Sequence, residues 1–257
     1  MNAEERAAFN IHAMRLYYPR RDRTKGNRRL LVVSEHEITA TLNGLIEDFV
    51  DRVSFFKAWK KGDINLPMSR KFLESFDYLV KSFPVLIAAG AAKAEDEATR
   101  ATLATNLYQE CGEGDLSRTH HAIYRKFLVT AGIDVSKLPS LSFTEDWKGE
   151  LSFYIATANP ASALGALAAG EFLAQPALSR IFSVLKPLYP RADDEYFTKH
   201  LVLETEHVKE ITVILEPLAQ RGQWEAVLAG FERGLSVWET YFDQLTVYLE
   251  ADSALKN

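Results

Sequence analysis

The sequence predicts an all-α fold, and three observations carry this prediction. Glycine and proline are sparse, with 13 and 9 occurrences in 257 residues. Alternation of Val, Ile and Thr with polar residues, which marks strands, is almost absent. Long stretches instead place apolar residues at i, i+3, i+4 and i+7, the spacing of a helix with one buried face. We therefore expect a bundle of about seven to eight helices.

The chain divides into two zones of different composition. Residues 1–34 contain a short candidate helix, Ala3 to Tyr18, followed by a basic, turn-rich run that ends at Ser34. We expect this zone to be an N-terminal arm or extension. Residues 35–252 show helical periodicity throughout and contain no internal repeat, so we expect them to form one domain.

The first two helices of this domain have recognisable starts. Ser34 and Glu37 have the spacing of a capping box, which opens a helix that reaches about Lys60. Pro67 opens the next helix, because proline is favoured in a first turn. Pro84 lies inside that helix and should kink it.

The later helices are delimited by Asp, Ser or Asn at their starts and by glycine at some of their ends. The expected spans are Asp96 to Gln109, a helix from Asp115 or Ser117 to Gly132, a helix near Glu150 after a linker, a long helix from Asn159-Pro160, a helix from Asp193 or Asp194, and a last helix from Gln223 to Leu249.

Composition excludes several classes of function. A net charge of −5 provides no general attraction to nucleic acids or anionic membranes. The single cysteine, Cys111, excludes an internal disulfide and a zinc ribbon, and we expect it to be a small buried side chain. The longest charge-poor stretch, residues 151–179, contains Glu171 and two prolines and reads poorly as a membrane span. No secretory signal is visible at the N-terminus, so we expect a cytoplasmic protein without nucleic-acid or membrane partners.

The informative residues are ionisable groups on core-facing helix stripes, because a buried charge needs a partner. His200, Glu204 and His207 are spaced i, i+4 and i+7 and lie within roughly 40° of one another around the helix axis. They fall inside the apolar stripe of that helix. The alternatives to a metal site are a polar helix edge or core histidines paired with Glu204.

Glu171 is the only formally charged residue between Leu151 and Ser179. It shares a helix face with Leu167 and Leu178, which predicts that its carboxylate is buried. The alternative to a ligand role is a buried acid that pairs with a distant arginine or stays neutral.

Glu110 lies at the C-terminal end of its helix, where an acid opposes the helix dipole and a compensating cation is favoured. An ordinary helix-end acid beside a glycine turn is the alternative. His120 shares a face with Tyr124 and Phe127 and should point to the core, whereas His121 should lie at the wetter edge. The two adjacent histidines leave a one-residue ambiguity.

Three acids and three histidines are thus predicted to face the interior, and no basic residue on their helices has a spacing that would neutralise them. A pair of divalent ions would do so, because carboxylates can bridge two ions and imidazoles complete the shells. Acids and histidines without a thiolate favour iron or manganese over structural zinc.

These residues resemble a known family. The pattern Glu110-x9-His120, then Glu171, then His200-x3-Glu204-x2-His207 is similar to that of the haem-oxygenase-like diiron oxidases and oxygenases. The resemblance covers about residues 67–215 and includes Phe83-Pro84 and the run from Asn106 to Gly114. It implies a haem-oxygenase-like helical bundle.

The resemblance also implies a function. The residues at the family's ligand positions would bind two iron ions, or iron and manganese, with O2 as co-substrate. The substrate would be a small amino-acid-like or fatty-acid-like molecule held in the helical core, and an external electron donor and a homodimer are compatible with this class. The family more often has Asp at the position of Glu204, whose extra methylene should alter binding of the second ion. The implied catalytic and metal-binding residues are Glu110, His120, Glu171, His200, Glu204 and His207.

Two other functions remain open at this point. One is a metal-free enzyme on the same fold, like the thiaminase or quinone-cofactor-forming members. The other is a non-catalytic helical binding protein whose buried acids pair with Arg or Lys. For an enzyme, an all-apolar pocket would indicate a fatty acid, and an acidic or basic side chain in the pocket would indicate an amino acid.

Overall fold

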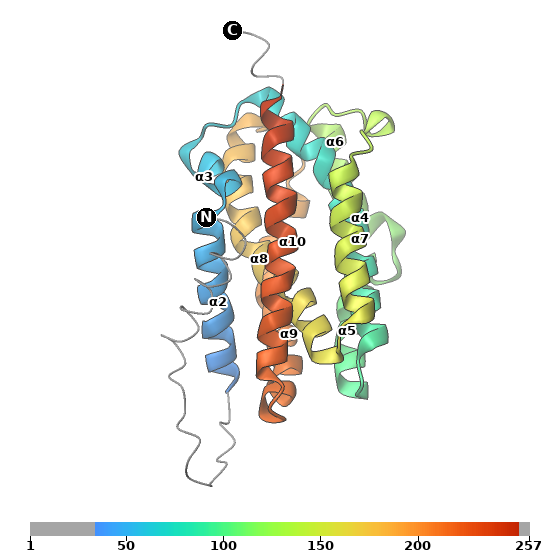
Figure 1. The fold of residues 1–257 in the computed structure, drawn as a ribbon. Coiled ribbons are helices and arrows are strands. Elements are labelled where there is room, and N and C mark those ends of the chain that lie inside the picture. The colour runs from blue at the N-terminus through green and yellow to red at the C-terminus, as the bar shows by residue number, and fades with distance from the viewer. Residues whose placement is uncertain (1–33, 252–257) are drawn as a thin grey trace. The chain divides into compact units, whose positions relative to one another are not determined.

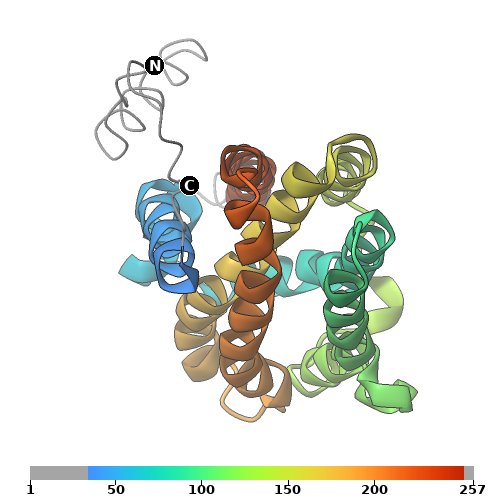
Figure 2. The ribbon, with the colours of Figure 1, turned by 90° about the horizontal axis from the view of Figure 1, so that it is seen from below.

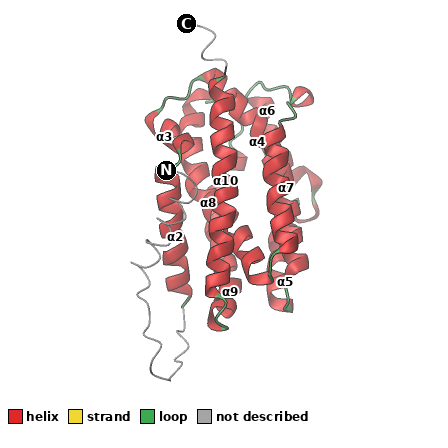
Figure 3. Ribbon diagram, viewed as in Figure 1, coloured by secondary structure: helices red, strands yellow, loops and turns green. Residues whose placement is uncertain are grey.

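A computed structural model describes residues 34–251, and these form nine α-helices and no strand (Figure 3). The all-α prediction is confirmed, although the helix count is higher than expected. The proposed arm of residues 1–34, with its candidate helix from Ala3 to Tyr18, lies outside the described residues except for Ser34. Among the helices of residues 34–251, none is long and apolar enough to cross a membrane.

The first predicted helix is two helices. The capping box forms as expected, since Ser34 Oγ accepts from the Glu37 N–H and the Glu37 carboxylate accepts from the Ser34 N–H at 2.9 Å. Helix α2 (Glu35–Arg52) then ends at Val53, whose backbone is extended with φ −71° and ψ 127°. Helix α3 (Ser54–Lys61) follows and ends at Gly62, where φ is 74°.

Helix α4 (Leu66–Lys93) runs through Pro84 as one element. Helix α5 (Glu97–Glu110) is capped by Asp96, whose Oδ1 accepts from the Thr99 N–H at 2.8 Å. A tight turn follows α5, with positive φ at Gly112, Glu113 and Gly114. A side chain at Gly112 would put its Cβ 2.6 Å from the Thr119 nitrogen, so this turn requires glycine.

The predicted helix start at Asp115 or Ser117 is wrong. Asp115 caps only a single 3-10 turn, Leu116–Arg118, by accepting from the Ser117 N–H. Helix α6 (His120–Thr130) starts later because Thr119 Oγ1 accepts from the Ala122 N–H at 3.0 Å.

Helix α7 (Ser142–Thr157) begins earlier than the expected start near Glu150. The sequence did not reveal this start because Leu141, at the N-cap position, forms no side-chain cap. The three C-terminal helices match their predictions. They are α8 (Pro160–Leu188), α9 (Glu195–Gln220) and α10 (Trp224–Glu250).

Helix α8 lies at the centre of residues 34–251 and packs against α9 and α10 (Figure 1). In the view from below, α10 again runs alongside these helices (Figure 2). The approach of α8 to α10 is close enough to need glycine. A Cβ on Gly165 would lie 2.1 Å from the Val227 oxygen, and one on Gly230 would lie 1.9 Å from the Ser162 oxygen. This close contact sets the position of α8 against α10, and Glu171 on α8 is buried in the interior.

Candidate metal centre

The six predicted site residues meet in the interior of the helical domain, on α5, α6, α8 and α9. All are buried, as their positions on core-facing stripes predicted. The exposed fractions are 6% for Glu110, 1% for His120, 1% for Glu171, 5% for His200, 4% for Glu204 and 1% for His207.

The residues form two groups of three, which we call the Glu110 triad (Glu110, His120 and His200) and the Glu171 triad (Glu171, Glu204 and His207). Within each triad, one ligand atom from each residue lies within 4.8 Å of the other two. His120 Nδ1 is 2.8 Å from Glu110 Oε2. His207 Nδ1 is 3.4 Å from Glu171 Oε2 and 3.7 Å from Glu204 Oε2.

Helix geometry explains how the six residues come together. The i, i+4, i+7 spacing places three residues on one face of α9, and His200 joins the Glu110 triad while the other two join the Glu171 triad. Glu110 is the last residue of α5, and His120 is the first residue of α6. The positive-φ turn at Gly112 brings these two helix ends together.

The two triads differ in electrostatics. Burial lowers the pKa of His120 and that of His200 to about 3, so both imidazoles are in the neutral form that binds metals. Burial raises the pKa of Glu110 to about 7 and that of Glu204 to about 7. Burial also disfavours the charge on His207, but the Glu171 and Glu204 carboxylates beside it raise its pKa to about 11.

Hydrogen bonds fix the ring nitrogens of two histidines. His200 Nδ1 is 2.6 Å from the Tyr196 carbonyl oxygen, to which it donates, so its Nε2 is the free nitrogen. His207 Nε2 is 3.1 Å from Gln109 Oε1, which leaves Nδ1 toward the carboxylates. A ligating histidine that donates its other N–H to an oxygen is the usual arrangement at metal sites.

Four buried polar atoms of the triads form no hydrogen bond of good geometry among the described residues, although His120 Nδ1 and His207 Nδ1 lie near the carboxylate oxygens named above. They are both ring nitrogens of His120, Nδ1 of His207 and Oε2 of Glu204. Each such atom costs about 1–3 kcal/mol if it stays unsatisfied. All four are nitrogen or carboxylate donors of the kind that iron and manganese bind, so the residues present fit a pair of divalent ions.

His121 lies outside both triads. Its Nε2 is 3.0 Å from Asp77 Oδ1, and Arg125 also binds the Asp77 carboxylate, with Nε 3.0 Å from Oδ1 and the second terminal nitrogen 3.1 Å from Oδ2. The prediction that His120 faces the core and His121 the wetter edge is confirmed.

Two contacts of the triads and the exposure of one residue differ from what the sequence predicted. Asn106 Nδ2 donates to Glu171 Oε1 at 3.2 Å, and Gln109 contacts His207 as described. The spacing of Asn106 one turn before Glu110 was visible, but no pattern marked Gln109. Cys111 was expected to be buried and is exposed, because it follows the last turn of α5 at the helix end.

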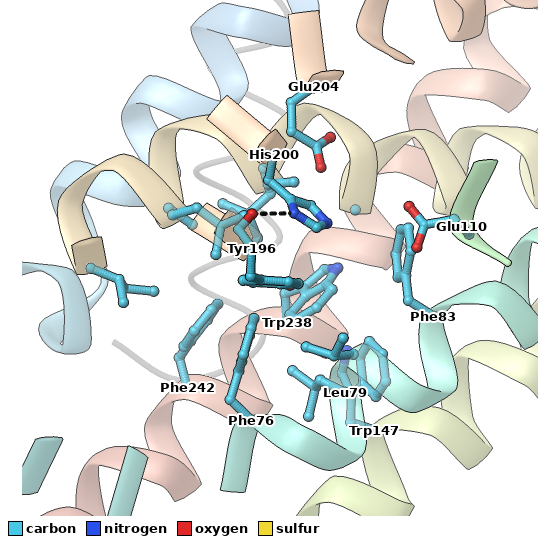
Figure 4. A pocket seen from close by; sticks show the side chains of 17 residues that line it. Phe76, Leu79, Phe83, Glu110, Trp147, Tyr196, His200, Glu204, Trp238 and Phe242 are labelled. Atoms are coloured by element: carbon cyan, nitrogen blue, oxygen red, sulfur yellow. Dashed lines mark hydrogen bonds between the residues drawn. The ribbon is translucent and has the colours of Figure 1, made fainter. Parts of the chain in front are cut away.

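A cavity adjoins the triads, and Figure 4 shows Glu110, His200 and Glu204 among the side chains around it. The cavity has a volume of about 80 Å³. Apart from these three residues, the lining consists of apolar and aromatic residues with no Lys, Arg, Asp or further Glu. The labelled aromatic residues are Phe76, Phe83, Trp147, Tyr196, Trp238 and Phe242.

Comparisons with known proteins agree with this architecture. The chain is 23% identical over 191 residues to a 4-aminobenzoate synthase from Chlamydia pneumoniae. The alignment covers 72% of this chain and 84% of the relative. A CADD-like protein of unknown function from Nostoc punctiforme superposes with a TM-score of 0.72 at 17% identity, covering 84% of this chain and 98% of that one.

A domain of unknown function with a heme oxygenase-like fold, from Shewanella denitrificans, superposes with a TM-score of 0.67 at 18% identity, covering 86% of this chain and 96% of that one. The predicted fold is therefore confirmed. The family model described as "iron-containing redox enzyme" matches residues 70–239, which is more than half of the chain and includes all six triad residues. This chain belongs to the family of iron-containing redox enzymes.

Proposed function

We propose that this protein is an O2-dependent oxidase or oxygenase with a pair of metal ions, most simply two irons or iron and manganese. The observation that carries the proposal is the pair of buried triads, with three of their six residues also lining a cavity. A substrate in that cavity would lie directly beside both triads. When bound, the metal pair supplies the redox chemistry that activates O2.

The two triads would divide the metal binding. The Glu110 triad offers two neutral imidazoles and one carboxylate, a donor set typical of non-haem iron oxygenases. The Glu171 triad offers one imidazole and two carboxylates. The apolar cavity wall would exclude water and orient a substrate, and Glu110, His200 and Glu204 both line the cavity and belong to the triads that would hold the metals.

The lining of the cavity favours a fatty-acid-like substrate over an amino acid. No Lys or Arg lines it to receive a carboxylate, and Glu110 and Glu204 are the only acids that line it. A carboxylate from either substrate would have to bind at the metal pair. An amino acid would also bring an ammonium, which would lack a partner because Glu110 and Glu204 would bind the metals. An acyl chain would contact the apolar walls, with its carboxyl group near the triads.

Formation of a small aromatic acid is the second candidate. The relative from Chlamydia pneumoniae carries the name 4-aminobenzoate synthase. The aromatic rings around the cavity would also pack well on a benzoate ring. This candidate rests on a distant relationship and is tested together with the first.

The metal-free alternatives fit less well. A helical binding protein would pair its buried acids with Arg or Lys, but within residues 34–251 no Arg or Lys forms an ion pair with either triad. In a metal-free enzyme the buried His120 Nε2, which has no hydrogen-bond partner among the described residues, would stay unsatisfied. An electron donor, a homodimer and a cytoplasmic location stay predictions.

The test is anaerobic reconstitution with Fe(II), with and without Mn(II), followed by exposure to O2. Metal is quantified per chain, and O2 uptake is measured with panels of fatty acids, amino acids and benzoates. We expect two ions per chain and substrate-dependent O2 uptake, highest with fatty acids. Absence of stoichiometric metal, together with no O2 uptake on any panel, would contradict the proposal.

A further inference from the structure

Helix α5 contributes one residue to the Glu110 triad, but two of its amide side chains contact the other triad. Asn106 and Gln109 lie four residues and one residue before Glu110. Asn106 Nδ2 donates to Glu171 Oε1 at 3.2 Å, and Gln109 Oε1 accepts from His207 Nε2 at 3.1 Å. The last turn of α5 therefore touches two of the three members of the Glu171 triad.

The contact from Gln109 selects the nitrogen that His207 offers. An oxygen acceptor at Nε2 requires that nitrogen to carry the proton. The lone pair of the neutral ring then lies on Nδ1, which faces Glu171 and Glu204. His207 is the sole imidazole of this triad, so the triad has no other nitrogen ligand if the ring turns or changes tautomer.

The contact from Asn106 orients the Glu171 carboxylate. It occupies Oε1, and Oε2 remains toward His207. Asn106 is 1% exposed, and its own Oδ1 has no partner among the described residues. A buried carbonyl without a partner is destabilising, so a leucine at this position would pack better. The residue is therefore better explained by what it does to Glu171 than by its effect on stability.

We propose that Asn106 and Gln109 are positioning residues of the Glu171 triad, which set its metal affinity from α5. This inference rests on the proposed metal centre. Helix α5 would then supply Glu110 to one ion and hold two ligands of the second ion, Glu171 and His207, in place. Outer-shell partners of this kind typically change metal affinity by about 10–100-fold.

The test compares Gln109→Leu and Asn106→Leu with the wild-type chain by anaerobic equilibrium dialysis against Fe(II). We expect each variant to bind one ion normally and the other about 10–100-fold more weakly. Gln109→Glu keeps an oxygen acceptor for His207 and should restore binding of both ions. Thr105→Leu changes an exposed residue of the same helix and is the matched control, which should bind two ions as the wild type does.

A second readout separates positioning from general damage. In the zinc-loaded protein, which is diamagnetic, nitrogen-15 NMR of the histidine rings should show His207 with a protonated Nε2 and a metal-bound Nδ1. Gln109→Leu should lose this signature, while the His200 ring, whose Nδ1 is held by the Tyr196 carbonyl, should keep its own.

The outcomes are distinguishable. Unchanged affinity for both ions in Gln109→Leu and Asn106→Leu would overturn this inference and leave the metal centre intact. Equal weakening of both ions, or failure of Gln109→Glu to restore binding, would also overturn it, because the amides would then matter only for packing. A wild-type chain that binds no ion would overturn the proposed function itself.

Discussion

The Glu110 triad and the Glu171 triad handle buried acidic groups in different ways. The Glu110 triad is assembled from the end of α5, the start of α6 and the second turn of α9, and its two imidazoles are neutral. The Glu171 triad comes from the interiors of α8 and α9, and its imidazole has a pKa raised to about 11 by two carboxylates. Burial raises the pKa of one acid in each triad, Glu110 and Glu204, but only the Glu171 triad holds a histidine whose pKa is raised by neighbouring carboxylates.

Each triad depends on a different part of the molecule. The Glu110 triad depends on the Gly112 turn that joins two helix ends, and two of its members line the cavity. The Glu171 triad depends on helix packing around α8 and on amide contacts from α5, and only Glu204 reaches the cavity. We therefore expect changes at the two triads to have separable effects.

The largest expected effect comes from breaking one triad while sparing the other. His120→Ala should remove one ion and lower turnover by more than about 100-fold, because losing a ligand exceeds the usual outer-shell effect. The adjacent His121→Ala is the matched control and should retain both ions, since His121 binds Asp77 instead. Metal analysis and O2 uptake check this, and the assignment is wrong if His121→Ala is the variant that loses metal.

Metal removal should affect both triads and is the next largest effect. Each ion present at about 100-fold its Kd adds about 2.7 kcal/mol to the free energy of unfolding. For a chain of this size that corresponds to roughly 5–10 °C in Tm per ion. Scanning calorimetry with and without chelator measures it. His207→Leu should retain about half of the metal-dependent rise in Tm. A rise as large as that of the wild type would contradict a separate ion at the Glu171 triad.

The cavity allows substrate binding to be changed without touching either triad. Ala177 lines the cavity and is 6% exposed, so Ala177→Leu should fill part of the space. We expect KM for the longest acyl substrates to rise about tenfold, as the extra volume costs about 1–3 kcal/mol on overpacking. Metal content should not change. Equal KM values for short and long substrates in the variant would place the substrate elsewhere.

The smallest effect concerns Asp77, which supports α6 from outside the triads. Burial acts to raise the pKa of Asp77, but hydrogen bonds from His121 and Arg125 hold it below the ordinary value of 3.8. Because the folded-state pKa is the lower one, the carboxylate stabilises the fold above pH 3.8, and this is lost as the pH falls through the folded-state pKa. Arg125 is partly exposed, which weakens the pair.

Asp77→Asn should therefore lower the free energy of unfolding at pH 7 by about 1 kcal/mol, with both ions retained. Denaturant unfolding at several pH values measures this. The gap between wild type and variant should close as the pH falls below 3.8. A gap of the same size at all pH values would mean that the Asp77 charge plays no part.

Much of the site was predictable because helical spacing determines which residues share a face. His200, Glu204 and His207 follow from the i, i+4, i+7 rule, and Glu171 stands out as an acid in an apolar stretch. The start of α7 was missed because Leu141 provides no side-chain cap. The division of the six residues into two triads also could not be predicted from the sequence. Nothing in the spacing assigns His200 to one triad and His207 to the other.

Gln109 illustrates the limit most clearly. Neighbouring residues on a helix point about 100° apart, so a residue next to Glu110 is not expected on the same side of the helix. Its side chain is long enough to reach His207 on α9 from the edge of that face. Contacts of this kind depend on how two helices cross, which the sequence of either helix alone does not contain.

Anomalous X-ray diffraction would show whether the two triads are two metal sites. Crystals grown anaerobically with Fe(II) should give two iron peaks, one bounded by Glu110, His120 and His200 and one bounded by Glu171, Glu204 and His207. A single peak, an absence of peaks, or a peak beside His121 instead would contradict the account.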